Sequence, residues 1–132
     1  MVIDTSALLA MFFAEPERKR FLELITQAET RLLSAANGLE TGIVLEARRG
    51  EAAGREFDLF LIRAQIDVVP VDLEQIEIAR AAWRKYGKGR HPAALNFGDC
   101  FAYALARTSG EPLLAKGADF VQTGLLMCDK PC

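Results

Sequence analysis

Residues 1–14 read MVIDTSALLAMFFA, and this stretch decides the fold. Residues 1–4 form a short apolar run that ends at an acid, which is typical of a buried strand rather than of an amphipathic edge strand. Residues 6–13 are apolar at spacings that a helix can accommodate. A buried strand that leads directly into a helix is the first half of a strand–helix–strand unit, and it predicts a parallel sheet.

The remainder of the chain repeats this alternation. We expect further strands at residues 31–34, 66–71 and 112–115, and a candidate last strand at 125–128. Further helices are expected from residue 16 onward and at 35–49, 51–64, 73–86 and 97–110. Short apolar strands separated by helices predict the α/β class, with a short, mostly parallel sheet of four to five strands flanked by helices. The 132 residues suit a single domain over 1–132.

The composition excludes several classes of protein. With 51% hydrophobic and 26% charged residues, the chain is too apolar to be disordered. The uncharged apolar run at 7–14 is far shorter than the roughly 20 residues that span a bilayer, and Asp4 precedes it where a signal peptide carries basic residues. The three cysteines show no zinc or disulfide spacing. We therefore expect no membrane segment and a cytoplasmic location.

Charge is distributed unevenly along the chain. The net charge is −2, yet residues 78–98 contain five basic side chains and His91 without a single acid, while the remainder carries 11 basic and 18 acidic residues. A local cationic segment suits a phosphate-rich partner, and Arg84, Lys85, Lys88 and Arg90 are the candidate contacts. The alternative is an ordinary solvated helix end and loop.

Acidic residues follow the predicted strands. In parallel α/β sheets, ligands bind beyond the carboxyl ends of the strands. Asp4 ends the first strand and Asp119 follows the fourth, so both are candidates for a site at this edge. Each has a simpler interpretation: Asp4 as the N-cap of the helix that follows, and Asp119 as a turn aspartate.

Glu40 is the acid with the most unusual neighbours. On a helix, the positions one turn away from it are all apolar: Ala36, Ile43, Val44 and Ala47. A carboxylate on an apolar face points inward, and there it must be paired, protonated or bound to a metal ion. A salt bridge to Arg48 or Arg49 is the alternative.

Asp99 occupies the first turn of the helix predicted from residue 97. Asn96 can cap this helix and Asp99 can return the interaction from the third position, as in a capping box. An acid fixed in this way can still face the carboxyl end of the sheet, so capping and a functional role are compatible.

Taken together, Asp4, Glu40, Asp99 and Asp119 predict a metal site. Carboxylates gathered at one edge repel one another by about 4 kcal/mol per pair at 4 Å and an effective dielectric constant of 20. Without a cluster of histidine or cysteine, an all-oxygen site favours Mg²⁺ or Mn²⁺. Such ions stabilise the charge that develops on a phosphodiester during in-line displacement, and the basic segment before Asp99 would hold the nucleic-acid backbone.

On these residues the chain resembles the VapC-type toxins of the PIN-domain ribonuclease family. The matching segments are MVIDTSA at the start, LETGIVLEA around Glu40, and WRKYGKGRHPAALNFGDCFAYA, which contains Arg84 and Asp99. Together they cover nearly the whole chain. The last turn departs from the pattern of many relatives, because Ala118 and Gly124 stand where those carry acids.

The resemblance implies a Mg²⁺- or Mn²⁺-dependent endoribonuclease whose metal ligands and catalytic groups are Asp4, Glu40, Asp99 and Asp119. It implies that Ser6 and Asn96 orient these acids. It further implies an RNA substrate, a cognate antitoxin protein and a homodimer.

Two alternatives to a ribonuclease stay open from the residues. Ala118 and Gly124 allow a non-catalytic binding module that keeps the fold. A haloacid-dehalogenase-like phosphatase would need a second aspartate two residues after Asp4, where Ser6 stands.

Overall fold

The computed structural model describes residues 1–128. Its strands are β1 (Val2–Ile3), β2 (Leu32–Ser34), β3 (Asp67–Val69) and β4 (Leu113–Leu114). Its helices are α1 (Thr5–Phe12), α2 (Arg18–Gln27), α3 (Ala35–Arg49), α4 (Glu51–Arg63), α5 (Leu73–Tyr86), α6 (Phe97–Ser109) and the 3₁₀ helix η1 (Phe120–Thr123). Over this range, no helix is both long and apolar enough to cross a lipid bilayer.

The four strands form one sheet in the order β3-β2-β1-β4, and every pair is parallel. The predicted α/β class with a parallel sheet is therefore confirmed. The candidate last strand does not form, because residues 125–128 contact β4 through a single bridge between Leu113 and Met127. A chain that pairs at one position lacks the ladder of hydrogen bonds that defines a strand.

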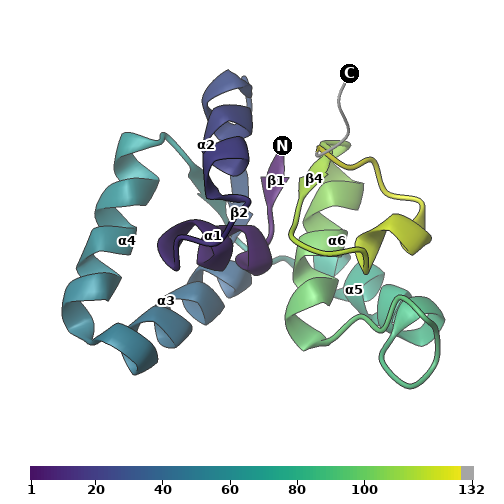
Figure 1. Ribbon diagram of the computed structural model, residues 1–132. Coiled ribbons are helices and arrows are strands. Elements are labelled where there is room, and N and C mark those ends of the chain that lie inside the picture. Colours follow the sequence, from purple (N-terminus) through teal and green to yellow (C-terminus); the bar gives the residue numbers. More distant parts are fainter. Residues whose placement is uncertain (129–132) are drawn as a thin grey trace.

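Helices cover both faces of the sheet (Figure 1), with α1 to α4 on one side and α5 and α6 on the other. Neighbouring side chains of a strand point to opposite faces. Accordingly Ile3 and Leu114 belong to the core that contains Leu8 and Phe57, whereas Val2 and Leu113 belong to the core built on α5 and α6. Residues buried on both faces explain the continuous apolar strands of the sequence.

The topology brings the carboxyl ends of β1, β2 and β4 to one edge. From β1 the chain moves to β2 and β3 on one side, and later returns to the other side of β1 as β4. The backbone N–H of Asp4 donates to the carbonyl of Leu114 over 2.9 Å, so the end of β1 lies directly beside the end of β4. Such a reversal of strand order is the place where open α/β sheets bind ligands.

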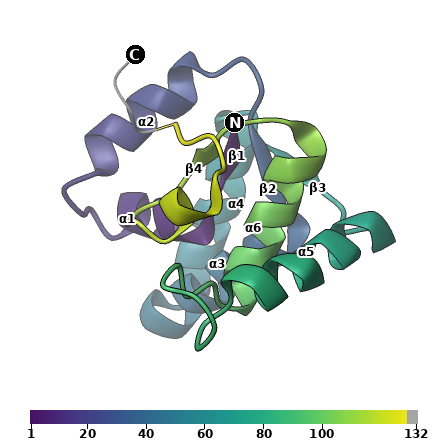
Figure 2. The same ribbon diagram turned by 90° about the vertical axis from the view of Figure 1, so that its right-hand side faces the viewer.

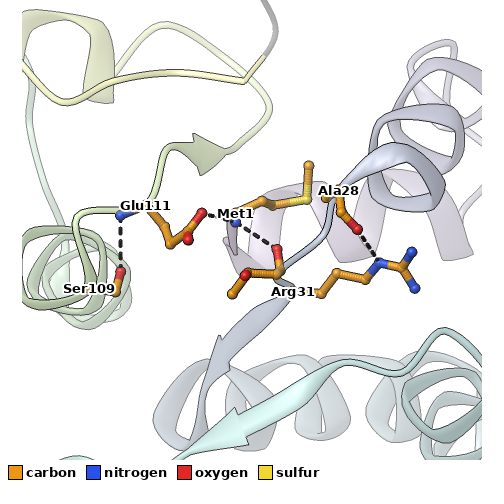
Figure 3. A network of polar contacts seen from close by, with 6 residues as sticks. Met1, Ala28, Arg31, Ser109 and Glu111 are labelled. Carbon is orange, nitrogen blue, oxygen red and sulfur yellow. Dashed lines mark hydrogen bonds and ion pairs between the residues drawn. The ribbon is translucent and has the colours of Figure 1, made fainter.

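Polar contacts at the start of β1 hold the opposite edge of the sheet (Figure 3). The α-amino group of Met1 donates to the carbonyl of Thr30 over 2.7 Å and pairs with Glu111 over 2.5 Å. Arg31 donates to the carbonyls of Ala28 and Ala64, over 3.2 Å and 2.6 Å. These contacts join the segments before β1, β2 and β4, and they leave the carboxyl edge free for a site.

Candidate active site

Asp4 lies at the end of β1 and caps α1. Its Oδ2 accepts hydrogen bonds from the backbone N–H of Ser6 over 3.0 Å and from the Ser6 hydroxyl over 2.6 Å. The Ser6 Oγ in turn accepts from the backbone N–H of Lys116 over 2.9 Å, which connects it to the segment after β4. The N-cap interpretation is thus correct, but it uses only one carboxylate oxygen.

The other oxygen of Asp4 is the unusual one. The side chain is 3% exposed, and Oδ1 has no hydrogen-bond partner within residues 1–128. Burial raises the pKa of Asp4 from 3.8 to about 7, against the lowering effect of the Ser6 hydrogen bonds. The charges of Asp99 and Glu40 also contribute to this raised pKa. The carboxylate therefore lacks the positive charge that its ionised form needs.

Glu40 lies on α3, and its carboxylate contacts the first residue of α1, Thr5. Its Oε1 accepts a hydrogen bond from the Thr5 hydroxyl over 2.5 Å and a longer one from the Asn37 amide over 3.4 Å. The carboxylate lies over Gly98, where a Cβ atom would come within 2.4 Å of Oε2. A Cβ atom at this point of α6 would force the Glu40 carboxylate to move.

The alternative interpretation, a salt bridge from Glu40 to Arg48 or Arg49, is wrong. Both guanidinium groups lie over the ring of Phe13, at 4.9 Å and 4.7 Å from its centre, and Arg49 also donates to the carbonyl of Phe12. The inward face of α3 also differs from the expected one, because Ile43 is 57% exposed.

The buried stripe of α3 consists of Asn37, Thr41 and Leu45. Glu40 therefore lies at the margin of this stripe and not in its centre. That position keeps its carboxylate half-buried and within reach of a ligand at the carboxyl edge of the sheet.

Asp99 and Asn96 form the capping box that their spacing predicts. The Asn96 side chain accepts from the N–H of Asp99 over 2.9 Å, and Oδ2 of Asp99 accepts from the N–H of Asn96 over 3.0 Å. Burial raises the pKa of Asp99, and the charges of Asp119 and Glu40 raise it further, although the hydrogen bond from Asn96 opposes them. The Asp99 side chain therefore belongs both to the helix cap and to the group of acids.

Asp119 is exposed at the start of η1 and makes no capping hydrogen bond with its side chain. Its charge is near enough to Asp99 to raise the pKa of that residue. The four predicted acids thus lie at one edge and influence one another electrostatically. They do not form a preformed metal-binding cluster, because no three His, Cys, Asp or Glu side chains of residues 1–128 are arranged to hold a metal ion.

Three residues of this edge were not among the sequence candidates: Thr5, Asn37 and Gly98. Thr5 binds Glu40, Asn37 binds both Glu40 and the carbonyl of Gly98, and Gly98 makes room for Glu40. Two weak signals were present in the sequence. Thr5 directly follows Asp4, and Asn37 precedes Glu40 by three positions, which places both on one side of a helix.

Comparison with known proteins decides the family. The model of the PIN domain matches residues 1–126. Ribonuclease VapC30 of Mycobacterium tuberculosis is 56% identical over 125 residues, which cover 95% of each chain. Ribonuclease VapC of Mycolicibacterium smegmatis is 53% identical over 120 residues, covering 91% of this chain and 93% of that protein. The chain belongs to the VapC ribonucleases of the PIN-domain family. The predicted family and enzyme class are confirmed, and the haloacid-dehalogenase-like alternative is wrong.

Solved VapC structures share this fold. The crystal structure of VapC20 from Mycobacterium tuberculosis, described as a sarcin-ricin loop cleaving toxin, superposes with a TM-score of 0.75 at 21% identity and covers 95% of each chain. VapBC2 from Rickettsia felis, bound to a promoter DNA fragment, gives a TM-score of 0.70 at 15% identity, covering 96% of this chain and 94% of that one. The parallel sheet with flanking helices is the VapC architecture.

The basic segment of this VapC chain is an ordered loop. Gly87 and Leu95 form a bridge, and the N–H of Lys88 donates to the carbonyl of Leu95 over 2.9 Å. The Arg90 guanidinium lies 4.4 Å from the centre of the Trp83 ring, an attractive cation–π arrangement. The loop lies beside the end of α6 that carries Asp99 (Figure 2).

All four basic candidates, Arg84, Lys85, Lys88 and Arg90, are exposed. At Lys85 the ammonium lies 5.1 Å from the centre of the Tyr86 ring. The segment therefore presents its charges to solvent from a defined backbone.

VapC ribonucleases of the PIN-domain family are in general dependent on a divalent metal ion. The residues of this edge fit such an ion in kind, because carboxylate oxygens are the ligands of hard cations. The unpartnered Oδ1 of Asp4 and the raised pKa values of Asp4 and Asp99 agree, since a cation between these carboxylates would stabilise their ionised forms.

Proposed function

We propose that this chain is a Mg²⁺- or Mn²⁺-dependent endoribonuclease that acts as the toxin of a toxin–antitoxin pair. The observation that carries the proposal is the environment of Asp4. A 3% exposed carboxylate at the carboxyl edge of a parallel sheet has one oxygen without a partner and a pKa of about 7. The charges of Glu40 and Asp99 contribute to this raised pKa, and the charge of Asp119 raises the pKa of Asp99.

Asp4, Glu40, Asp99 and Asp119 are the proposed metal ligands and catalytic groups. Ser6 donates two hydrogen bonds to Oδ2 of Asp4. Oδ1 is therefore the oxygen that is left to bind a metal ion. Asn96 likewise binds Oδ2 of Asp99, while Thr5 binds Oε1 of Glu40. A bound divalent cation supplies Lewis-acid stabilisation of the charge that develops on the phosphodiester.

RNA is the proposed substrate, and the basic loop is its proposed binding site. Arg84, Lys85, Lys88 and Arg90 are exposed on the last turn of α5 and on the loop that leads to α6. Phosphate contacts from such side chains position a strand without reading its sequence. Because the proposed substrate is cellular RNA, the proposed location of the enzyme is the cytoplasm.

An antitoxin is the proposed protein partner. The solved neighbours include VapBC2 from Rickettsia felis and a toxin–antitoxin complex from Klebsiella pneumoniae. An arginine of such a partner can form bidentate hydrogen bonds with carboxylates, and these acids offer several. Binding there would block the site by supplying the missing positive charge.

A homodimer is the proposed oligomeric state, with the apolar surface around Phe97 as its interface. Phe97 is 81% exposed and Leu39 is 66% exposed. Apolar pockets of about 460 Å³ and 340 Å³ flank Phe97, one toward α3 and the other toward α5. A large apolar patch of this kind marks an interaction surface. A sedimentation mass of twice 14.5 kDa tests this state.

The deciding experiment uses purified, antitoxin-free protein and total cellular RNA. We expect new RNA ends with Mg²⁺ or Mn²⁺ and none with EDTA, and none with the Asp4→Asn variant in either condition. Mapping the ends then identifies the cleaved sequence. A non-catalytic binding module predicts instead that RNA is bound but stays intact in every condition.

A further inference from the structure

Asn37 is a fully buried polar side chain at the carboxyl edge of the sheet. It lies in the first turn of α3 and is 0% exposed. Its amide nitrogen donates to the carbonyl of Gly98 over 3.0 Å and to Oε1 of Glu40 over 3.4 Å. Both partners are acceptors, so the nitrogen and not the oxygen of the amide must face them.

The hydrogen bond to Gly98 joins the two helices that carry Glu40 and Asp99, and the one to Glu40 lies within α3. Glu40 belongs to α3, and Gly98 directly precedes Asp99 in the first turn of α6. The close approach of Glu40 to Gly98 leaves no room for a Cβ atom. The Asn37 amide thus bridges α3 and α6 beside the approach of Glu40 to Gly98.

The backbone of Asn37 contacts Thr5, the residue that follows the third acid. Its carbonyl accepts from the Thr5 hydroxyl over 3.4 Å and from the Thr41 hydroxyl over 2.8 Å. Thr5 directly follows Asp4, and the same hydroxyl donates to Glu40. One residue therefore connects the elements that carry Asp4, Glu40 and Asp99.

Folding alone does not account for an asparagine at this position. Its amide oxygen has no hydrogen-bond partner within the described part of the chain, and burying such an atom costs stability. A leucine has the same branching and a similar shape without that cost. What distinguishes asparagine here is its donation to Gly98 and Glu40.

We propose that Asn37 is a positioning residue of the ribonuclease site, which sets the separation between the carboxylates of Glu40 and Asp99. This inference rests on the proposed function. The side chain acts through Glu40 and through the first turn of α6, and it does not itself touch substrate. Loss of the amide donor lets both carboxylates drift from the geometry that a divalent cation requires.

Two variants of matched shape test the role. Asn37→Leu removes the polar atoms, and Asn37→Asp replaces the donor by an acceptor. For both we expect kcat and Mn²⁺ affinity to fall about 10- to 100-fold, the range seen when groups that orient metal ligands are removed. The KM for RNA should stay within about twofold, because the phosphate contacts of the basic loop are untouched.

Thr41→Val is the matched control. Thr41 is also 0% exposed and donates to the Asn37 carbonyl, but it touches no carboxylate. We expect a lower melting temperature with unchanged kcat and Mn²⁺ affinity. Asn37 variants that fold and cleave RNA with wild-type kcat and Mn²⁺ affinity would overturn the proposal.

A measurement on the unaltered protein decides the question even if a variant does not fold. The chain contains two asparagines and four glutamines, so ¹⁵N labelling gives six side-chain amide groups, and comparison with the Asn37→Leu or Asn37→Asp spectrum assigns the Asn37 signals. Adding Mg²⁺ should shift the Asn37 amide signals. The Gln75 amide is the internal control, because it is buried on α5 and donates to the carbonyl of Pro70.

The failures of the two proposals are distinguishable. If the wild-type protein neither binds divalent metal nor cleaves RNA, the proposed function fails. If it does both while the Asn37 signals stay in place on adding Mg²⁺, the positioning role alone is wrong.

Discussion

Replacing Asp4 by asparagine should stabilise the metal-free protein at neutral and alkaline pH while it abolishes RNA cleavage. The substitution keeps an acceptor oxygen for the two Ser6 hydrogen bonds at 3.0 Å and 2.6 Å and removes the buried charge. An amide in place of the carboxylate also removes the charge that a divalent cation needs. Stability and activity therefore change in opposite directions.

The magnitude follows from the pKa of Asp4, which burial raises from 3.8 to about 7. Because the folded state holds its proton more tightly than the unfolded state, the penalty is absent below pH 3.8, grows as the pH rises, and is complete above about pH 7. The free energy of unfolding lost to this charge is about 4 kcal/mol at pH 8 and about 2 kcal/mol at pH 5.

The asparagine carries a cost of its own. Its amide nitrogen takes the place of Oδ1, which has no partner within residues 1–128, and an unpaired buried donor costs about 1–3 kcal/mol. The expected net gain is therefore about 1–3 kcal/mol at pH 8 and close to zero at pH 5.

Urea unfolding in EDTA at pH 5 and pH 8 measures this difference. The matched control is Asp72→Asn, because Asp72 also caps a helix, with Gln75 as the donor, but is exposed and is not among the charges that raise the pKa of Asp4 or Asp99. It should show no gain that grows with pH. An Asp4→Asn protein that is less stable than wild type at pH 8 would refute the reasoning, because the ionised carboxylate would then be a favourable helix cap.

Three further substitutions probe the same edge. Glu40→Gln should reduce both cleavage and the thermal shift on adding Mn²⁺, whereas Arg48→Ala should leave both unchanged because Arg48 contacts Phe13 and not Glu40. Gly98→Ala should lower kcat about tenfold or more, since its Cβ would lie 2.4 Å from Oε2 of Glu40 and displace that carboxylate. Binding of RNA in Ca²⁺ at increasing salt should show a slope flatter by about 1 to 1.5 in the Lys88→Ala, Arg90→Ala double variant. An unchanged slope would place the RNA elsewhere.

The sequence by itself determined those features that depend on neighbours along the chain. The strand–helix alternation, the cap at Asp4 and the capping box of Asn96 and Asp99 are each set by residues within four positions of one another. For that reason they could be predicted from spacing. The edge on which the acids gather followed as well, because all strands of a parallel sheet end on the same side.

The tertiary structure decided how these acids are held. Glu40 binds Thr5, 35 positions away, and not the arginines of its own helix. Asn37 binds Gly98, 61 positions away. The periodicity of α3 could not show which stripe is buried, because that depends on how α1, α4 and α6 pack against it, and a rotation of one residue moves a side chain by about 100° around the helix axis. Such contacts arise only when distant segments pack together, and local spacing carries no information about them.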